Sequence, residues 1–333
     1  MRTGLLFGLV AFLISLTGCT RSVEGEVELL NVSYDPTREL WQDLNKAFAA
    51  DFEIRHGTPI KLEQSHGGSS SQARSVIDGL KADVVTLALW SDTDALRRKG
   101  LIAEGWEERL PNRSLPYYST IVFVVRNGNP KGIKDWPDLV KPGVGVITPN
   151  PKTSGNGRLS FLAAWGAIRD QGGSEADAEE YIRKLYRNVK VLDTGARGST
   201  VTFAQRKVGD VQITWENEGH LEVLESKGAL EIVYPSRSIK AEPHVAWVDR
   251  NVDKHGTRQA AEEYLRFLYT PPAQEIIARN YYRPTDAEVM KKNAERFPDI
   301  KLFPVTSFVT DWDEAQSKFF DDQAVFDRIY TAK

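Results

Sequence analysis

Short apolar runs alternate with helical periodicities along the chain from residue 27 onward. Residues 84–89 form a largely apolar run, which is typical of a strand covered on both faces. Earlier in the chain, Leu40, Leu44 and Phe48 recur every four residues, which predicts one face of an amphipathic helix. The order of elements predicts a mostly parallel sheet in an α/β unit. The predicted elements of this unit are strands over residues 27–32, 59–63 and 84–89, and helices over residues 36–52 and 69–81.

A second α/β unit follows an apolar strand at residues 121–125, which runs into a cluster of turn-forming residues at 126–130. We therefore predict two lobes joined by two crossing strands. Lobe 1 is expected to comprise residues 27–121 and 247–333, and lobe 2 residues 122–246. The later predicted elements are strands over residues 144–148, 189–192, 211–215 and 245–248, and helices over residues 154–169, 178–186, 199–206, 258–269 and 273–279.

The N-terminus has the pattern of an export signal. An apolar run over residues 5–14 is too short to cross a bilayer but suits a signal-peptide core. It ends in Leu-Thr-Gly-Cys at residues 16–19, which resembles the bacterial lipobox. We predict a signal peptide over residues 1–18, lipid attachment at Cys19, a tether over residues 19–26 and a periplasmic or cell-surface location. An ordinary secretory signal with an incidental cysteine, or a cut nearby, is the alternative. The chain contains no other stretch of 18 apolar residues.

Composition narrows the classes of function. The 333 residues include 43 Lys and Arg against 46 Asp and Glu, a net charge of −3, which argues against a strongly basic nucleic-acid surface. One cysteine excludes an intramolecular disulfide and a multi-thiolate metal site. The five histidines show no HExxH or HxH spacing, and no GxxxxGK[ST] motif occurs. We therefore expect no metal, no cofactor and no nucleic-acid partner.

Four small, polar or glycine-rich loops precede a predicted helix or follow a predicted strand. In an open α/β sheet such loops meet at the carboxyl edge of the strands, where ligands bind. Helix N-termini there present unpaired N–H groups and about half a positive charge each, so several together can bind an anion without Lys or Arg. The four loops cover residues 33–37, 65–70, 151–157 and 193–200.

These loops carry a family resemblance. The chain resembles the periplasmic sulfate-binding proteins of ABC transporters, in the prokaryotic sulfate/thiosulfate-binding protein family, over nearly its whole mature length. The resemblance implies a type II, Venus-flytrap α/β fold with mixed sheets and a ligand cleft between the lobes. It also implies a monomer that delivers sulfate to an ABC permease. The blocks that carry the resemblance are residues 29–40, 64–69, 149–155, 163–166, 193–200 and 215–218.

The resemblance further implies a dehydrated sulfate held by neutral donors alone. Sulfate carries no proton to donate at neutral pH, so a pocket made only of donors suits it, whereas protonated phosphate would leave its own O–H unpaired. The implied contacts are the main-chain N–H groups of Ser69, Ser154, Gly155, Asn156 and Ala196, the Ser154 hydroxyl and the Trp215 indole N–H.

Two of these positions bear on the ligand. Asn156 stands where many sulfate binders have Gly, as thiosulfate binders commonly do, and Asn is tolerated there unless the site needs a positive φ. Trp215 indicates sulfate, because the resembled thiosulfate binders tend to carry Phe, which has no N–H. We therefore expect sulfate as the ligand, with thiosulfate or another tetrahedral oxyanion such as molybdate as alternatives.

Three polar residues beside these contacts are expected to support the loops behind them. Asp35 is predicted to cap a helix or polarise a loop amide, and Arg197 to pair with a carboxylate or with loop carbonyls. His66 is assigned a supporting position. An exported serine hydrolase using Ser154 or His66 is the alternative from another class, although no GxSxG motif surrounds Ser154. We expect no catalytic residue.

Overall fold

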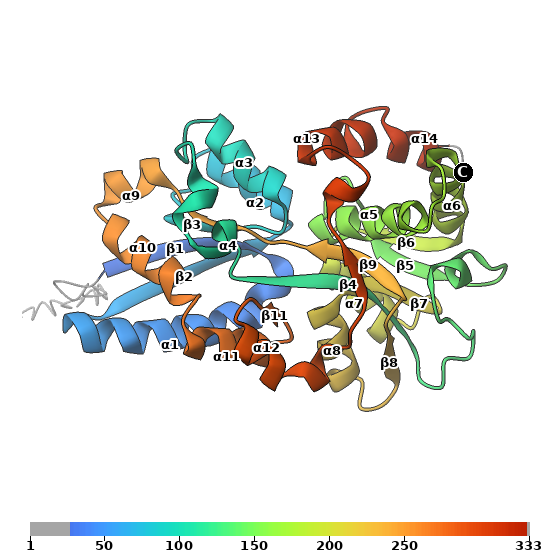
Figure 1. Ribbon diagram of the computed structural model, residues 1–333, viewed down its shortest axis with the longest axis horizontal. Coiled ribbons are helices and arrows are strands. Elements are labelled where there is room, and N and C mark those ends of the chain that lie inside the picture. The colour runs from blue at the N-terminus through green and yellow to red at the C-terminus, as the bar shows by residue number, and fades with distance from the viewer. Residues whose placement is uncertain (1–26, 332–333) are drawn as a thin grey trace, which may run out of the picture.

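The computed structural model describes residues 27–331 and shows two lobes, each built on its own sheet (Figure 1). We define lobe 1 as the elements around a four-stranded sheet of order β10-β3-β1-β2 and lobe 2 as those around an eight-stranded sheet. In the first sheet β1 pairs in parallel with β2 and β3, whereas β10 pairs with β3 in antiparallel. The predicted two-lobed α/β fold with mixed sheets is confirmed. The strands of lobe 1 are β1 (Val27–Tyr34), β2 (Ile60–Gly67), β3 (Val84–Thr86) and β10 (Val245–Trp247).

Helices cover both faces of the first sheet because successive strand residues point to opposite sides. Val84 packs in the core with α1, α10 and α11, whereas its neighbour Val85 packs in the core with α2 and α3. The helices of lobe 1 are η1 (Asp35–Thr37), α1 (Arg38–His56), α2 (Ser69–Ile77), α3 (Trp90–Arg98), η2 (Trp106–Arg109), α4 (Pro111–Ser114), α9 (Asp249–His255), α10 (Arg258–Phe267), α11 (Pro271–Arg279), α12 (Ala287–Lys292) and η5 (Ala294–Arg296).

A long strand, β4, connects the lobes. Its first residues pair with β11, and the remainder pairs with β7, β8 and β9 in the second sheet, whose main path is β12-β9-β4-β7-β5-β6. Figure 1 shows β4 running from one lobe into the other. These strands are β4 (Tyr117–Arg126), β5 (Val146–Pro149), β6 (Val189–Asp193), β7 (Val211–Trp215), β8 (Leu230–Val233), β9 (Arg237–Ala241), β11 (Arg283–Pro284) and β12 (Lys301–Phe303).

Three helices of lobe 2, α5, α7 and α8, follow the strands β5, β6 and β7 in the chain. α5 is buried along most of its length, and α6 starts with a capping box between Ser174 and Asp177. α7 continues directly into a π-helix, η4. The helices are η3 (Trp136–Val140), α5 (Gly155–Asp170), α6 (Glu175–Asn188), α7 (Ala196–Thr200), η4 (Val201–Gln205) and α8 (Glu216–Glu225). None of the helices among residues 27–331 has the length and apolarity needed to cross a membrane.

The C-terminal segment packs with lobe 2, which differs from the predicted assignment of all residues 247–333 to lobe 1. β12 pairs with β9, and the Phe319 ring lies 4.8 Å from that of Trp165 and 5.5 Å from that of Phe161. Burying these aromatic side chains against α5 fixes the segment there, and no local pattern specifies that partner. The segment continues after β12 with η6 (Val305–Ser307), α13 (Trp312–Ala315), η7 (Gln316–Phe320) and α14 (Val325–Thr331).

Most predicted elements exist, and the differences lie at their ends. The strand predicted over residues 84–89 ends at Thr86, and its last apolar residue, Leu89, is instead the N-cap of the unpredicted helix α3. The helix predicted over residues 199–206 begins earlier, at Ala196. The predicted signal peptide, tether and Cys19 lie outside the described residues.

Candidate functional site

A small cavity lies where the two lobes meet. It collects residues from all four predicted loops, which confirms that these loops lie together. Among the described residues that line it there is no Lys, Arg or His. The lining residues are Tyr34, Asp35, Pro36, Gly67, Gly68, Ser69, Ala88, Ser154, Gly155, Asn156, Gly195, Ala196 and Trp215.

Three helices begin at this cavity: α2 after Gly68, α5 after Ser154 and α7 after Gly195. The first intrahelical bond of α2 is donated by the fourth residue, Gln72, and that of α7 by Ser199. The N–H groups of earlier residues therefore have no partner within the helix, and the helix dipoles add positive potential at the same ends. This geometry suits an anion.

The side chain of Ser69 is already hydrogen-bonded within the protein, so only its main-chain N–H can donate to a ligand. The Ser69 hydroxyl donates to Asp92 Oδ2 at 2.5 Å and accepts from the Ala88 N–H at 3.0 Å. Burial raises the pKa of Asp92, and Arg158, whose Nη1 lies 3.9 Å from Asp92 Oδ1, opposes that shift. The buried serine is thus locked between strand and helix, and its N–H is left for a ligand. Sequence reasoning missed Ala88, Asp92 and Arg158, because no loop pattern singles them out.

One of the expected contacts, in the loop before α5, is not available to a ligand. The Ser154 N–H donates to the Asn150 carbonyl at 2.9 Å, so this N–H is not available to a ligand. Its hydroxyl oxygen accepts from the Gly157 N–H at 3.3 Å, which leaves the hydroxyl hydrogen free to donate. Ser154 therefore stays in the site through its side chain alone.

Asn156 faces the cavity with its backbone. Its side-chain amide donates to Thr214 Oγ1 at 3.4 Å and accepts from the Ser160 hydroxyl at 3.0 Å. Asn156 lies in the first turn of α5 and has no positive φ. Because Asn156 has no positive φ, asparagine adopts this backbone conformation without strain, and glycine is not required here.

Trp215 supplies a side-chain donor at the end of β7. The residue is fully buried, its Nε1 has no hydrogen-bond partner among the described residues, and it lines the cavity. The Tyr34 ring packs against the indole with centroids 5.3 Å apart. A buried indole N–H without a partner costs free energy, and a bound acceptor would remove that cost.

The three predicted supporting residues lie around the cavity, with different contacts. Asp35 lines it, but Asp35 Oδ1 pairs with Arg38 Nη2 at 2.7 Å and the N-cap of η1 is Tyr34, so the predicted capping role is wrong. His66 Nδ1 lies 2.6 Å from the Ser33 hydroxyl. Burial, helped by Arg38, lowers the pKa of His66 to about 4, so the ring is neutral at physiological pH.

Arg197 does not line the cavity, which agrees with its predicted pairing. Its Nη2 lies 2.7 Å from Glu39 and 3.3 Å from Glu218. Burial raises the pKa of Glu218 to about 7 and that of Glu222 to about 8. At pH 7 these buried carboxyl groups therefore hold a proton for a large fraction of the time, which limits the negative charge near the cavity.

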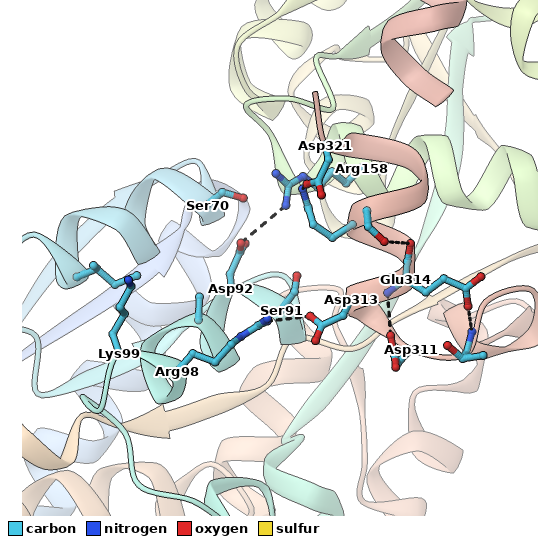
Figure 2. Close-up of a pocket in the computed structure, with 15 residues that line it drawn as sticks. Ser70, Ser91, Asp92, Arg98, Lys99, Arg158, Asp311, Asp313, Glu314 and Asp321 are labelled. Atoms are coloured by element: carbon cyan, nitrogen blue, oxygen red, sulfur yellow. Dashed lines mark hydrogen bonds and ion pairs between the residues drawn. The ribbon is translucent and has the colours of Figure 1, made fainter. Parts of the chain in front are cut away.

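Ion pairs join the lobes at two further places. Arg197 of lobe 2 pairs with Glu39 of lobe 1, and Arg98 of α3 lies 2.9 Å from Asp313 of α13. Figure 2 shows the second pair in an open groove. That groove is a poor anion site, because Asp311, Glu314 and other carboxylates line it.

The arrangement does not provide the pair that a serine hydrolase needs. Ser154 accepts from Gly157, whereas His66 contacts Ser33, which is fully buried. A nucleophile must instead lie within hydrogen-bond reach of its base and be accessible to substrate. The geometry gives the hydrolase alternative no support.

A donor-lined cavity between two α/β lobes defines a solute-binding receptor, and comparison with known proteins agrees. The chain matches the model of the bacterial extracellular solute-binding proteins over residues 41–283 and belongs to this family, alongside the sulfate-binding and thiosulfate-binding proteins. It is 54% identical to the sulfate-binding protein of Escherichia coli (strain K12) over 316 residues, 94% of this chain and 96% of that one.

Two further comparisons extend the likeness. The thiosulfate-binding protein of Pseudomonas aeruginosa is 50% identical over 305 residues, 91% of this chain and 92% of that one. The structure of the sulfate-binding protein SubI from Mycobacterium tuberculosis H37Rv superposes with a TM-score of 0.80 at 31% identity, covering 89% of this chain and all of that one.

Proposed function

We propose that this protein captures sulfate between its lobes through neutral hydrogen-bond donors and delivers it to an ABC permease. The observation that carries the proposal is the convergence of donors on a cavity whose lining has no basic side chain among the described residues. The donors are the N–H groups of Ser69, Gly155, Asn156 and Ala196, the Ser154 hydroxyl and the Trp215 indole N–H.

The magnitudes are sufficient for tight binding. About six hydrogen bonds to a charged ligand, at roughly 1.5–3 kcal/mol each, give on the order of 10–20 kcal/mol before the costs of dehydration and lobe closure. Micromolar binding needs about 8 kcal/mol net. A lining without a basic side chain can therefore hold a dianion.

Thiosulfate is the second candidate ligand, because a thiosulfate-binding protein is among the relatives at 50% identity. The free indole N–H of Trp215 supports sulfate, whose fourth oxygen can accept it, over thiosulfate, whose terminal sulfur is a weaker acceptor. Molybdate is the larger tetrahedral alternative.

Isothermal calorimetry of the chain without its first 18 residues, with Cys19→Ser, tests the ligand. Sulfate is expected to bind at micromolar or lower concentration, and phosphate and molybdate at least tenfold more weakly. Equal heats for sulfate and phosphate, or no sulfate binding between pH 6 and 8, would reject the proposal.

The remaining parts of the proposal concern location and assembly. Relatives of this family are extracellular binding proteins. For this chain we propose export by residues 1–18, a lipid anchor at Cys19 as the contact with a bacterial membrane, and action as a monomer. The N-terminal pattern supports the first two, and a cavity completed by the lobes of one chain supports the third.

A further inference from the structure

Arg283 and Glu216 form an ion pair that is almost completely removed from solvent. The Arg283 Nε and Nη2 atoms each lie 2.8 Å from a carboxylate oxygen of Glu216, and the side chains are 4% and 0% exposed. Arg283 also donates to the Pro298 carbonyl at 3.0 Å. Both charges lose their hydration, so such a pair stabilises a fold no better than apolar residues of similar volume. Stability alone therefore does not account for it.

The pair is connected to Trp215, which lines the cavity, through the chain and through β4. Strand β4 contacts both Trp215 and Arg283. Its residue Ile121 pairs with Trp215, and its residue Tyr118 pairs with Arg283. Glu216 follows Trp215 in the chain and begins α8. Since consecutive Cα atoms are about 3.8 Å apart and each side chain reaches roughly 5 Å, the Glu216 carboxylate lies within about 14 Å of the indole N–H.

An uncompensated carboxylate at this depth would repel a dianion in the cavity. Burial raises the pKa of Glu216, and the hydrogen bonds from Arg283 oppose that shift and favour the ionised form. At the effective dielectric constant of about 20 found in proteins, a unit charge within about 15 Å of a dianion changes affinity about tenfold or more. The Arg283 guanidinium is the cation that the structure places against this carboxylate.

We propose that Arg283 is the charge-compensating residue of the anion site, which neutralises Glu216 and so allows a cavity without a basic side chain to hold a dianion. The inference rests on the proposed function, because it requires a dianionic ligand. Arg283 does not line the cavity. It is a positioning residue that acts through Glu216 at the first turn of α8.

The test compares the two ways of breaking the pair. Sulfate affinity is measured by calorimetry, and thermal unfolding without sulfate is measured in parallel, on the mature chain and its variants. Arg283→Met leaves Glu216 without its cation. The ionised share of Glu216 grows with pH, so sulfate binding should weaken by roughly tenfold or more at about pH 9 and by less at about pH 6. Glu216→Gln leaves a positive charge and should preserve or tighten binding. The double variant Glu216→Gln with Arg283→Met should return close to the wild-type affinity.

The opposite directions of the two affinity changes separate charge compensation from a structural role. Both single variants should unfold at lower temperature, because each leaves one buried charge without a partner. Equal weakening of sulfate binding by Glu216→Gln and Arg283→Met would overturn the inference. If Arg283→Met does not fold, weaker binding by Glu216→Gln overturns it equally. Failure of the wild-type chain to bind sulfate would instead reject the proposed function itself.

Discussion

A substitution at Gly68 tests whether the ligand binds to the closed arrangement of the lobes that the structure shows. A Cβ atom on Gly68 of lobe 1 would lie 2.8 Å from the Thr153 carbonyl oxygen of lobe 2, closer than real Cβ contacts allow. The backbone of Gly68, at φ −60° and ψ 131°, is open to alanine. Gly68→Ala should therefore leave each lobe folded and oppose only their contact.

The magnitude follows from the cost of overpacking. Forcing a methyl group into a filled contact costs about 1–3 kcal/mol, and each 1.4 kcal/mol is tenfold in affinity. If only the closed, ligand-bound form meets this clash, the Kd for sulfate should rise roughly 5- to 150-fold. Calorimetry measures that rise, and the melting temperature without sulfate should change little.

Gly195→Ala is the matched control. Gly195 is also the N-cap of a helix at the cavity, and its φ of −158° is extended backbone that alanine adopts. A Cβ there would lie 3.5 Å from Asp35 Oδ2, which is an ordinary contact. Sulfate affinity should stay near that of the wild type. Wild-type affinity in Gly68→Ala, or an equal loss in both variants, would refute the reasoning about closure.

Four further predictions address the donors, the lobe contact, pH and the anchor. Trp215→Phe should cost roughly 1–3 kcal/mol of sulfate binding by calorimetry, one hydrogen bond, and unchanged affinity would remove the indole from the site. Asp313→Asn breaks an exposed pair worth about 0–1 kcal/mol, so sulfate affinity should fall by at most about fivefold and less at high salt; a larger loss would contradict this. The pKa of His66 lies below its unfolded value of about 6.5, so unfolding free energy should fall as pH drops from about 6.5 toward 4, and His66→Gln should flatten that slope in denaturant titrations. An unaltered slope would show that His66 does not contribute. The full chain made in bacteria should incorporate labelled palmitate and its Cys19→Ser variant should not, and absence of label in the wild type would exclude the lipid anchor.

The sequence predicted the site better than the outer packing of the lobes. The loops that form the cavity are short and lie at strand ends, so local glycine and serine patterns locate them. Ala88 and Asp92 escaped prediction, because one lies inside an apolar run and the other lies on an unpredicted helix, α3. The C-terminal segment escaped assignment, because Phe319 could pack on either lobe until α5 is in place. Contacts between residues far apart in the sequence decide where such segments pack, and the local pattern of apolar residues does not reveal those contacts.

The Ser154 N–H shows a second limit of sequence reasoning. A resemblance assigns a donor to a residue, but only the folded loop shows that the Asn150 carbonyl already accepts from it. Asn156 shows the converse, since its N–H lies in the first turn of α5, where the helix offers it no acceptor. Hydrogen-bond partners three or four residues apart thus decide which donors of a loop remain free.

A crystal structure of the sulfate complex tests the central claim most directly. We predict sulfate oxygens within about 2.7–3.2 Å of the N–H groups of Ser69, Gly155 and Ala196 and of the Trp215 indole nitrogen. No Lys or Arg side chain should contact the anion. Sulfate bound by a guanidinium or ammonium group, or found in the acidic groove of Figure 2, would contradict recognition by neutral donors.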